Sequence, residues 1–244
     1  MTLPLEQRLN YHPDPRNPSA SDRMVQARLD LITDKVDFTG KVVLDLGCSG
    51  GGFSFELARL AKKVIAVDAD AEIISRNRAI QQELGRGNLE FICARIDADL
   101  IRRIGPVDVT LLLSVYHHML TRSEAYDWNA AMAPWSAAEI LNAIHANTHV
   151  FVFEMGYPNE GYEWCKRLPD FGQDWDDYVL RTVFQGRYAS VEVHRPAVRV
   201  GWFNRYIISR LSRPYREDPW VVQKVKSLMK FDARNFRRIY IGAK

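Results

Sequence analysis

The sequence predicts an α/β fold in which a doubly wound parallel sheet carries helices on both faces. Apolar runs of strand length alternate with helical patterns from residue 21 onward, an order that is typical of parallel sheets. Several of these runs are continuously apolar rather than alternating, which indicates strands buried on both faces. The 244 residues are 47% hydrophobic and 26% charged, a balance that supplies a sizeable core and excludes a disordered chain.

The expected elements follow one another in a regular order. A first helix is expected from residue 21 to about 33, because Ser21 and Asp22 can cap it and its apolar residues fall on one side. The strands that follow are expected at residues 41–46, 64–67, 89–93, 107–113 and 149–154, with helices at 53–61, 71–82 and 136–146. Beyond these, a helix is expected near 174–184, with strands near 189–194 and 202–208.

Charge is divided unevenly along the chain. The net charge of +3 is too small to indicate a nucleic-acid-binding protein by itself. Residues 213–244 nevertheless hold nine basic and three acidic residues, whereas residues 1–212 sum to −3. We interpret the basic end as an extension containing an amphipathic helix, because its apolar residues recur at helical spacing. RNA binding is the alternative, because aromatic residues lie among the basic ones.

The sequence carries no sign of a membrane or secretory segment. Residues 1–20 are polar, and the longest apolar stretch, 107–116, is far shorter than the ~20 residues that a membrane span needs. Cys48, Cys93 and Cys165 are widely spaced, and no CxxC pair or Cys/His cluster indicates a metal site. We therefore expect a cytoplasmic location, no membrane span and no metal.

A glycine-rich loop follows the first strand. Residues 47–52 include four glycines between a buried strand and a helix, where the backbone can approach a ligand closely and the helix offers unpaired N–H groups. A dinucleotide-binding loop would place glycines at 47, 49 and 52, and Ser49 breaks that pattern. Asp45, two residues before the loop, suits a cation or an amine and would stand without a purpose beside a pyrophosphate.

Two more carboxylates follow the next two strands. Asp68 ends the second strand, twenty-one residues after Gly47, where a carboxylate can accept both hydroxyls of a ribose. Asp97 follows the third strand and can reach an adenine amine. The alternative for Asp97 is to cap the helix that begins beside it.

Together these residues resemble class I S-adenosylmethionine-dependent methyltransferases from about residue 42 to 154. Asp45, Gly47 and Gly51 fall on the glycine motif of that family, with Ser49 in place of its usual middle glycine. The resemblance implies a Rossmann-like, seven-stranded, mostly parallel sheet with one antiparallel strand at the end. It also implies S-adenosylmethionine as the cofactor, with its methionine part at the loop, its ribose on Asp68 and its adenine near Asp97. The residues expected to bind it are Asp45, Gly47, Cys48, Ser49, Gly51, Asp68, Ala69, Arg95, Ile96, Asp97 and Ser114.

On this interpretation the whole chain forms a single methyltransferase domain. Residues 1–40 provide an N-terminal segment and a helix. Residues 41–212 form the catalytic core, with a lid insertion near 121–147 after the fourth strand. Residues 213–244 form the basic C-terminal extension. The oligomeric state is not predicted.

The fourth strand leads into two adjacent histidines. In an open parallel sheet, ligands bind outside the carboxyl ends of the strands, so His117 and His118 are expected near the place of methyl transfer. Either could act as a general base for a protonated hydroxyl or amine. The alternative is that one histidine packs against the following helix while the other only lines the pocket.

A second resemblance concerns the methyl acceptor. Residues 94–97, 107–108 and above all 113–118 resemble the methyltransferase module of bacterial O-antigen chain-terminating kinase–methyltransferases. That likeness implies a phosphate on a terminal sugar as acceptor, which would need positioning by arginine rather than a base. The residues expected to bind the acceptor are Tyr116, Glu154, Tyr157, Trp164, Arg199 and Arg205.

Several acceptors remain open at this point. The first expectation is an oxygen of a phosphorylated or sugar-containing small molecule or of a glycan end. The second is a natural-product or metabolite hydroxyl or amine, with a histidine base. RNA is the third. A cofactor-binding protein without catalytic activity is the alternative to an enzyme.

Overall fold

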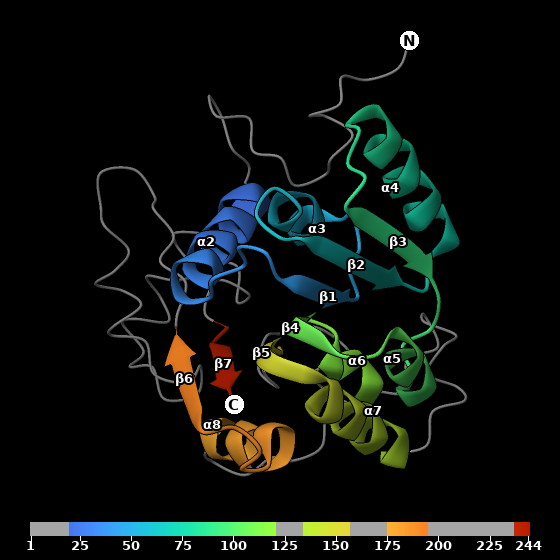
Figure 1. Cartoon of the computed structure of the whole chain (residues 1–244). Helices are drawn as coiled ribbons and strands as arrows, with labels where there is room; N and C mark the ends of the chain where they lie inside the picture. Colours follow the sequence, from blue (N-terminus) through green and yellow to red (C-terminus); the bar gives the residue numbers. More distant parts are fainter. Residues whose placement is uncertain (1–19, 121–133, 157–174, 195–236) are drawn as a thin grey trace.

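The computed structural model describes residues 20–120, 134–156, 175–194 and 237–244 (Figure 1). These residues form a seven-stranded sheet with the strand order β3-β2-β1-β4-β5-β7-β6. Its strands are β1 Val42–Leu46, β2 Lys63–Asp68, β3 Leu89–Cys93, β4 Val107–Leu113, β5 Thr148–Glu154, β6 Ser190–His194 and β7 Ile239–Ala243. Strands β1 to β5 pair in parallel, and β7 pairs antiparallel with both β5 and β6. The mostly parallel sheet with one antiparallel strand is therefore confirmed.

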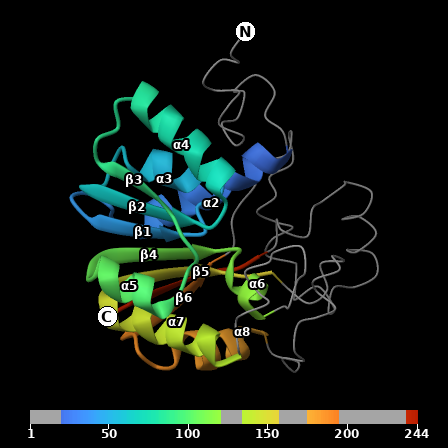
Figure 2. The same cartoon turned by 90° about the vertical axis from the view of Figure 1, so that its right-hand side faces the viewer.

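Helices cover both faces of this sheet (Figure 2). One face carries α2 Ala20–Lys35, α3 Gly52–Leu57 and α4 Ala71–Glu83. The other face carries α5 Ala98–Ile104, α7 Pro134–Asn147 and the π-helical turn Val179–Phe184, which continues α8 Trp175–Tyr178. The short helix α6 Tyr116–Leu120 follows β4 directly.

Successive residues of one strand point to opposite faces of the sheet and pack in the apolar core on that face. Val43 packs with the α2–α4 layer, whereas Leu44 packs with the α5–α7 layer. Both residues are 1% exposed or less. Because each strand buries both faces, its sequence is continuously apolar, as expected of a parallel sheet between two helical layers.

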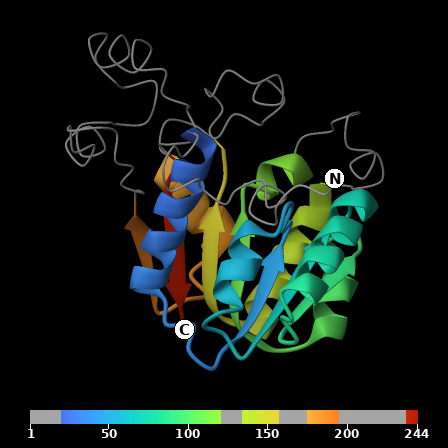
Figure 3. The ribbon, with the colours of Figure 1, turned by 90° about the horizontal axis from the view of Figure 1, so that it is seen from above.

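The far C-terminus differs from the expectation. Residues 213–244 were expected as an extension, but Ile239–Ala243 form β7 inside the sheet, between β5 and β6. Figure 3 shows β7 (red) running opposite to β5 (yellow). The apolar run of this strand is only a few residues long and follows a basic stretch, so the charge pattern concealed it. The expected strand at 202–208 and the amphipathic helix of the extension lie outside the described residues.

The range expected to form a lid, 121–147, is only partly described, and the described part is not a lid. Residues 121–133 lie outside the described part, whereas 134–147 form α7, in which Ile140, Leu141 and Ile144 are buried in the core. This half of the range therefore belongs to the sheet-covering layer. None of the helices in the described residues combines the length and the apolar character that a membrane span requires.

The topology brings the predicted site residues to one edge of the sheet. Strands β1 to β5 run in parallel, so their carboxyl ends meet there. Strand β7 runs the opposite way, and Phe153 of β5 pairs with Tyr240 of β7. The residues just before β7 therefore lie beside the end of β5.

Candidate active site

The glycine loop turns sharply between β1 and α3. Gly47, Ser49 and Gly51 have φ angles of 79°, 46° and 80°, in the left-handed region that glycine adopts most easily. A Cβ atom on Gly47 would overlap the Cγ2 atom of Val115. The glycine at 47 is thus required by the close packing of the turn after β4.

Ser49 occupies a backbone conformation that is unusual for a residue other than glycine. Its N–H donates to Oδ2 of Asp68 at 2.8 Å, and its carbonyl accepts from Nδ2 of Asn77 at 2.7 Å. These two bonds hold the position where the resembling family has a glycine. Asn77 was missed by the sequence analysis, since a polar residue within a helical pattern gives no sign that it is buried.

The three predicted carboxylates have different surroundings. Asp45 is buried and accepts a hydrogen bond from the Ser54 hydroxyl at 2.5 Å. Burial raises its pKa to about 6, although the Ser54 hydrogen bond acts in the opposite direction. A positive group bound beside Asp45 would therefore favour its ionised form.

Asp68 and Asp97 lie nearer the surface. The carboxylate of Asp68 accepts from the backbone N–H groups of Ser49 and Asp70, one on each oxygen. Because a carboxylate oxygen has two lone pairs, both oxygens can still accept from a diol. Oδ1 of Asp97 accepts from the N–H of Leu100 at 2.6 Å, which confirms Asp97 as the N-cap of α5. Its contact with adenine stays a prediction.

This donor set fits the expected cofactor. A buried carboxylate suits the charged amino group of a methionine moiety, and the fixed carboxylate of Asp68 suits a ribose diol. An exposed carboxylate after β3 stands where an exocyclic amine could donate. Around these groups, Cys48 and Ile96 are buried, whereas Ser49, Ala69 and Arg95 are exposed.

The two histidines lie on α6, at the carboxyl end of β4. His117 is buried, and its Nδ1 atom accepts from the N–H of Gly156 at 3.3 Å. The two imidazole rings are 4.2 Å apart between centroids. Burial, helped by the charge of Arg237, lowers the pKa of His117 to about 2 and that of His118 to about 4. Both rings are therefore neutral at pH 7.

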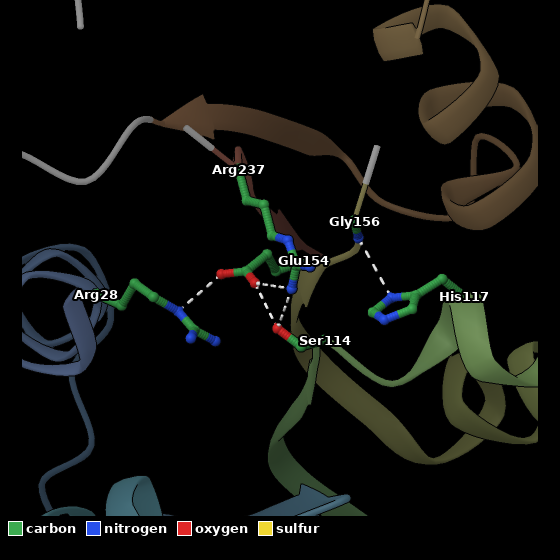
Figure 4. A network of polar contacts seen from close by, with 6 residues as sticks. All are labelled: Arg28, Ser114, His117, Glu154, Gly156 and Arg237. Carbon is green, nitrogen blue, oxygen red and sulfur yellow. Dashed lines mark hydrogen bonds and ion pairs between the residues drawn. The ribbon is translucent and has the colours of Figure 1, made fainter. Parts of the chain in front are cut away.

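A buried polar network lies beside His117 (Figure 4). Glu154, the last residue of β5, is fully buried, and its Oε2 atom lies 2.7 Å from Nε of Arg28. Its Oε1 atom accepts from the Ser114 hydroxyl at 2.6 Å and lies 3.6 Å from Nη1 of Arg237. The same Nη1 atom donates to Oγ of Ser114 at 2.8 Å. Segments from both ends of the chain are thus fixed to the ends of β4 and β5.

The structure places the predicted acceptor residues unequally. Glu154 lies in this network, next to Ser114. Tyr116 is 2% exposed and packs edge-on against Phe153, with ring centroids 5.6 Å apart. Tyr157, Trp164, Arg199 and Arg205 lie outside the described residues.

Sequence reasoning missed Arg28 and Arg237. Arg28 occurs in an ordinary helical pattern, and Arg237 occurs in a stretch of surface-like basic residues. Only the pairing of β7 with β5 and β6 brings Arg237 to the site. In the part of the chain that the structure describes, no group of three His, Cys, Asp or Glu side chains is arranged to hold a metal ion.

Comparison with known proteins agrees with this geometry. Residues 43–135 match a family described as a methyltransferase domain. Two Escherichia coli sequences of the O-antigen chain terminator bifunctional methyltransferase/kinase WbdD are 29% and 34% identical to this chain over 218 residues. The match covers 84% of this chain but only 28% of each relative. A shorter match covers 34% of this chain and 18% of a 23S rRNA (uracil(1939)-C(5))-methyltransferase RlmD from Xanthomonas campestris, at 35% identity.

Solved structures show the same fold. A crystal structure of WbdD covers 88% of this chain with a TM-score of 0.55 and 24% identity, and 39% of the WbdD chain is matched. A second match is the magnesium protoporphyrin IX methyltransferase ChlM from Synechocystis, which was solved with bound S-adenosylmethionine. The match spans 91% of this chain and 78% of the ChlM chain. Its TM-score is 0.52 at 14% identity.

The fold, the loop and these comparisons define the class of protein. The chain carries a methyltransferase domain of the S-adenosylmethionine-dependent class, which confirms the resemblance, the enzyme class and the cofactor expected from the sequence. Within that class, two relatives matched over most of this chain are methyltransferase/kinases of the WbdD type.

Proposed function

We propose that the protein transfers a methyl group from S-adenosylmethionine to an oxygen of a phosphorylated or sugar-containing small molecule, or of a glycan end. The observation that carries the proposal is a pair of neutral histidines, His117 buried and His118 half-buried, near an arginine at the end of β4. This arrangement is suited to an acceptor that is already an anion. The similarity to an O-antigen chain terminator supports a glycan end among such acceptors.

The chemistry asks little of the protein beyond alignment and the exclusion of water. When bound, the cofactor supplies a methyl group on a sulfonium; the acceptor oxygen takes this methyl group, and S-adenosylhomocysteine is left. A phosphate oxygen is ionised at pH 7 and needs no proton removed. The neutral rings of His117 and His118 then line the site and exclude water.

A general base would need different properties. Catalysis by a base is most efficient when its pKa lies near the working pH. The pKa values of His117 and His118, lowered to about 2 and 4, make both imidazoles weak bases. This favours the anionic acceptor over a metabolite hydroxyl or amine that would need a histidine base.

RNA is the less favoured acceptor. The rRNA methyltransferase matches only 34% of this chain. The aromatic and basic residues that motivated the RNA hypothesis lie largely within 195–236, outside the described residues. We therefore place RNA behind the glycan-end or phosphorylated acceptor.

An acceptor screen tests the proposal. Each candidate sugar or glycan end is offered together with its phosphorylated form, and the S-adenosylhomocysteine released is measured. We expect turnover with phosphorylated members and much less with their unphosphorylated partners. Turnover that is equal for both members of every pair would contradict an anionic acceptor, and no turnover above background with any sugar, metabolite or RNA would favour a non-catalytic cofactor-binding protein.

A further inference from the structure

Two buried arginines from opposite ends of the chain meet at one carboxylate. Arg28 lies on α2, and Arg237 lies two residues before the start of β7. They are 8% and 4% exposed, and Glu154 between them is 0% exposed. Figure 4 shows the two side chains reaching Glu154 from opposite sides. The inference concerns which substrate each arginine serves.

Arg28 lies on the cofactor side of Glu154. Its guanidinium carbon is 5.1 Å from the ring centroid of Phe53, which belongs to the helix that follows the glycine loop. Its charge also reaches Asp45, whose pKa it lowers against the effect of burial. Arg28 therefore links α2 to the loop and to the buried carboxylate beneath it.

Arg237 contacts the other carboxylate oxygen of Glu154, on the side of Ser114. Its Nη1 atom donates to the hydroxyl of Ser114, which follows β4 directly and lies two residues before α6. Its charge lowers the pKa of both His117 and His118. Arg237 is thus directed toward the turn where the acceptor of the proposed reaction would be placed.

The contact with Ser114 is held by unusual backbone geometry. Ser114 has a φ angle of 62°, which is strained for a residue other than glycine. Its N–H donates to the carbonyl of Glu154 at 2.9 Å, and its hydroxyl donates to the carboxylate of the same residue. Ser114 and Glu154 therefore fix the position of Nη1, as an arginine that binds a ligand requires.

We propose that Glu154 orients two arginines that have different roles: Arg237 binds a phosphate oxygen of the acceptor, and Arg28 positions the cofactor loop. The inference rests on the proposed function. A guanidinium matches phosphate oxygens through parallel N–H donors, and it keeps its charge when buried. A single carboxylate that orients both groups would keep the two substrates in register, which an in-line transfer needs.

The test measures two affinities on the full chain. Inorganic phosphate is the anion probe, titrated in the presence of S-adenosylhomocysteine, and S-adenosylhomocysteine alone is the cofactor probe. Arg237→Gln is expected to weaken phosphate binding by about tenfold or more, a loss of the size expected for one charged hydrogen bond. Its S-adenosylhomocysteine affinity is expected to stay within about twofold of wild type. Arg28→Lys is expected to show the reverse pattern.

Arg181→Gln serves as the matched control. Arg181 is exposed on the π-helical turn and pairs with Asp177 there, so its loss should change neither affinity. If Arg237→Gln does not fold, as judged by circular dichroism, Arg237→Lys and Ser114→Ala replace it. Both keep a positive charge but lose the planar or oriented contact, and a several-fold weaker phosphate affinity is expected from each.

The outcomes separate the two proposals. Unchanged phosphate affinity in the folded Arg237 variants would overturn the inference, and so would equal losses of both probes in the Arg28 and Arg237 variants. If the screen identifies a phosphorylated acceptor whose KM is the same in wild type and Arg237→Lys, only the inference fails. If the screen finds only neutral acceptors, the proposed function fails as well.

Discussion

Asp68 is held by backbone hydrogen bonds at the place where the ribose of the cofactor is predicted to bind. Its two oxygens accept from the N–H groups of Ser49 and Asp70, so the carboxylate is fixed before any ribose binds. Preorganisation of this kind reduces the entropy lost on binding. The place of Asp68 at the end of β2 was predicted correctly, because it depended only on a strand end and on its distance from the loop. Its contact with a ribose stays a prediction.

Replacing Asp68 should weaken cofactor binding while the fold is retained. Asp68→Ala removes two acceptors for the ribose and the anchor of the Ser49 N–H group. We expect the Kd for S-adenosylhomocysteine to rise by about 10- to 100-fold, as the loss of one or two charged hydrogen bonds implies. Calorimetry measures the affinity, and thermal unfolding checks the fold. Asp68→Asn is the matched variant, since it keeps one acceptor for the Ser49 N–H group; unchanged affinity in both would remove the ribose assignment.

The two histidines set the expected dependence on pH. Their pKa values, lowered from 6.5 to about 2 and 4, leave both rings neutral above about pH 5. With a phosphorylated acceptor, the rate should therefore show no histidine titration between about pH 6 and 9. His117→Ala and His118→Ala should lower the rate without changing the shape of the profile. A rise near pH 6.5 that is present in wild type and lost in one variant would contradict the anionic acceptor.

The same lowered pKa values affect stability with a defined sign. In the unfolded chain these histidines bind a proton near pH 6.5, whereas in the folded chain they do so only at about 4 and 2. More protons are then bound by the unfolded state, so stability is lost as the pH falls from about 6.5 toward 4. Urea unfolding should show a smaller loss over this range in His118→Ala than in wild type.

Helix α5 begins directly after Asp97, the residue for which the sequence allowed two roles. The sequence left helix cap and adenine contact as alternatives, and the structure shows that the cap is formed. One carboxylate oxygen can cap a helix while the side chain also faces a ligand. Local spacing could therefore predict the cap, whereas the adenine contact depends on the bound cofactor.

Two substitutions separate the functions of Asp97. Asp97→Ala removes the cap of α5 and should lower the free energy of unfolding by about 1 kcal/mol. Asp97→Ser retains a hydroxyl that can cap α5, so the stability of this variant should stay close to wild type. The predicted contact between the carboxylate and the adenine is lost. Chemical denaturation and S-adenosylhomocysteine titration are measured on both variants. Equal cofactor affinity in wild type and Asp97→Ser would leave Asp97 as a cap alone.

Element by element, the sequence predicted what depends on local pattern. The β1–loop–α3 unit was predicted because apolar runs, glycines and carboxylates lie close together along the chain. The helix expected at 136–146 is found as α7, but the same residues were also assigned to a lid, whereas the apolar positions of α7 join the core. The site partners Asn77, Arg28 and Arg237 could not be predicted, because each reaches its position only through contacts between distant segments.

In the whole molecule, β7 connects the edge strand β6 to the rest of the sheet, because it lies between β5 and β6. It is the hydrogen-bonded neighbour of β6 and of β5, and its Tyr240 hydroxyl donates to Asp176 of α8 at 2.5 Å. Arg238 also pairs with Asp176. Because β7 lies far along the sequence from β5, its pairing could not be inferred from a local pattern. The same pairing delivers Arg237 to the site, so the fold and the proposed acceptor contact depend on one strand.

Gly242 tests how tightly this last strand is packed. A Cβ atom there would lie 2.7 Å from a ring carbon of Phe184 and 2.9 Å from one of Tyr188. These rings are buried, so they have little room to move. Gly242→Ala should therefore lower the free energy of unfolding by about 1–3 kcal/mol, a typical cost of overpacking. For a chain of this size that corresponds to a fall in Tm of about 2–4 °C for each kcal/mol.

Gly87→Ala is the control, because nothing lies within 4 Å of the added atom. A Tm as high in Gly242→Ala as in Gly87→Ala would show that β7 is not packed tightly against the rings of Phe184 and Tyr188.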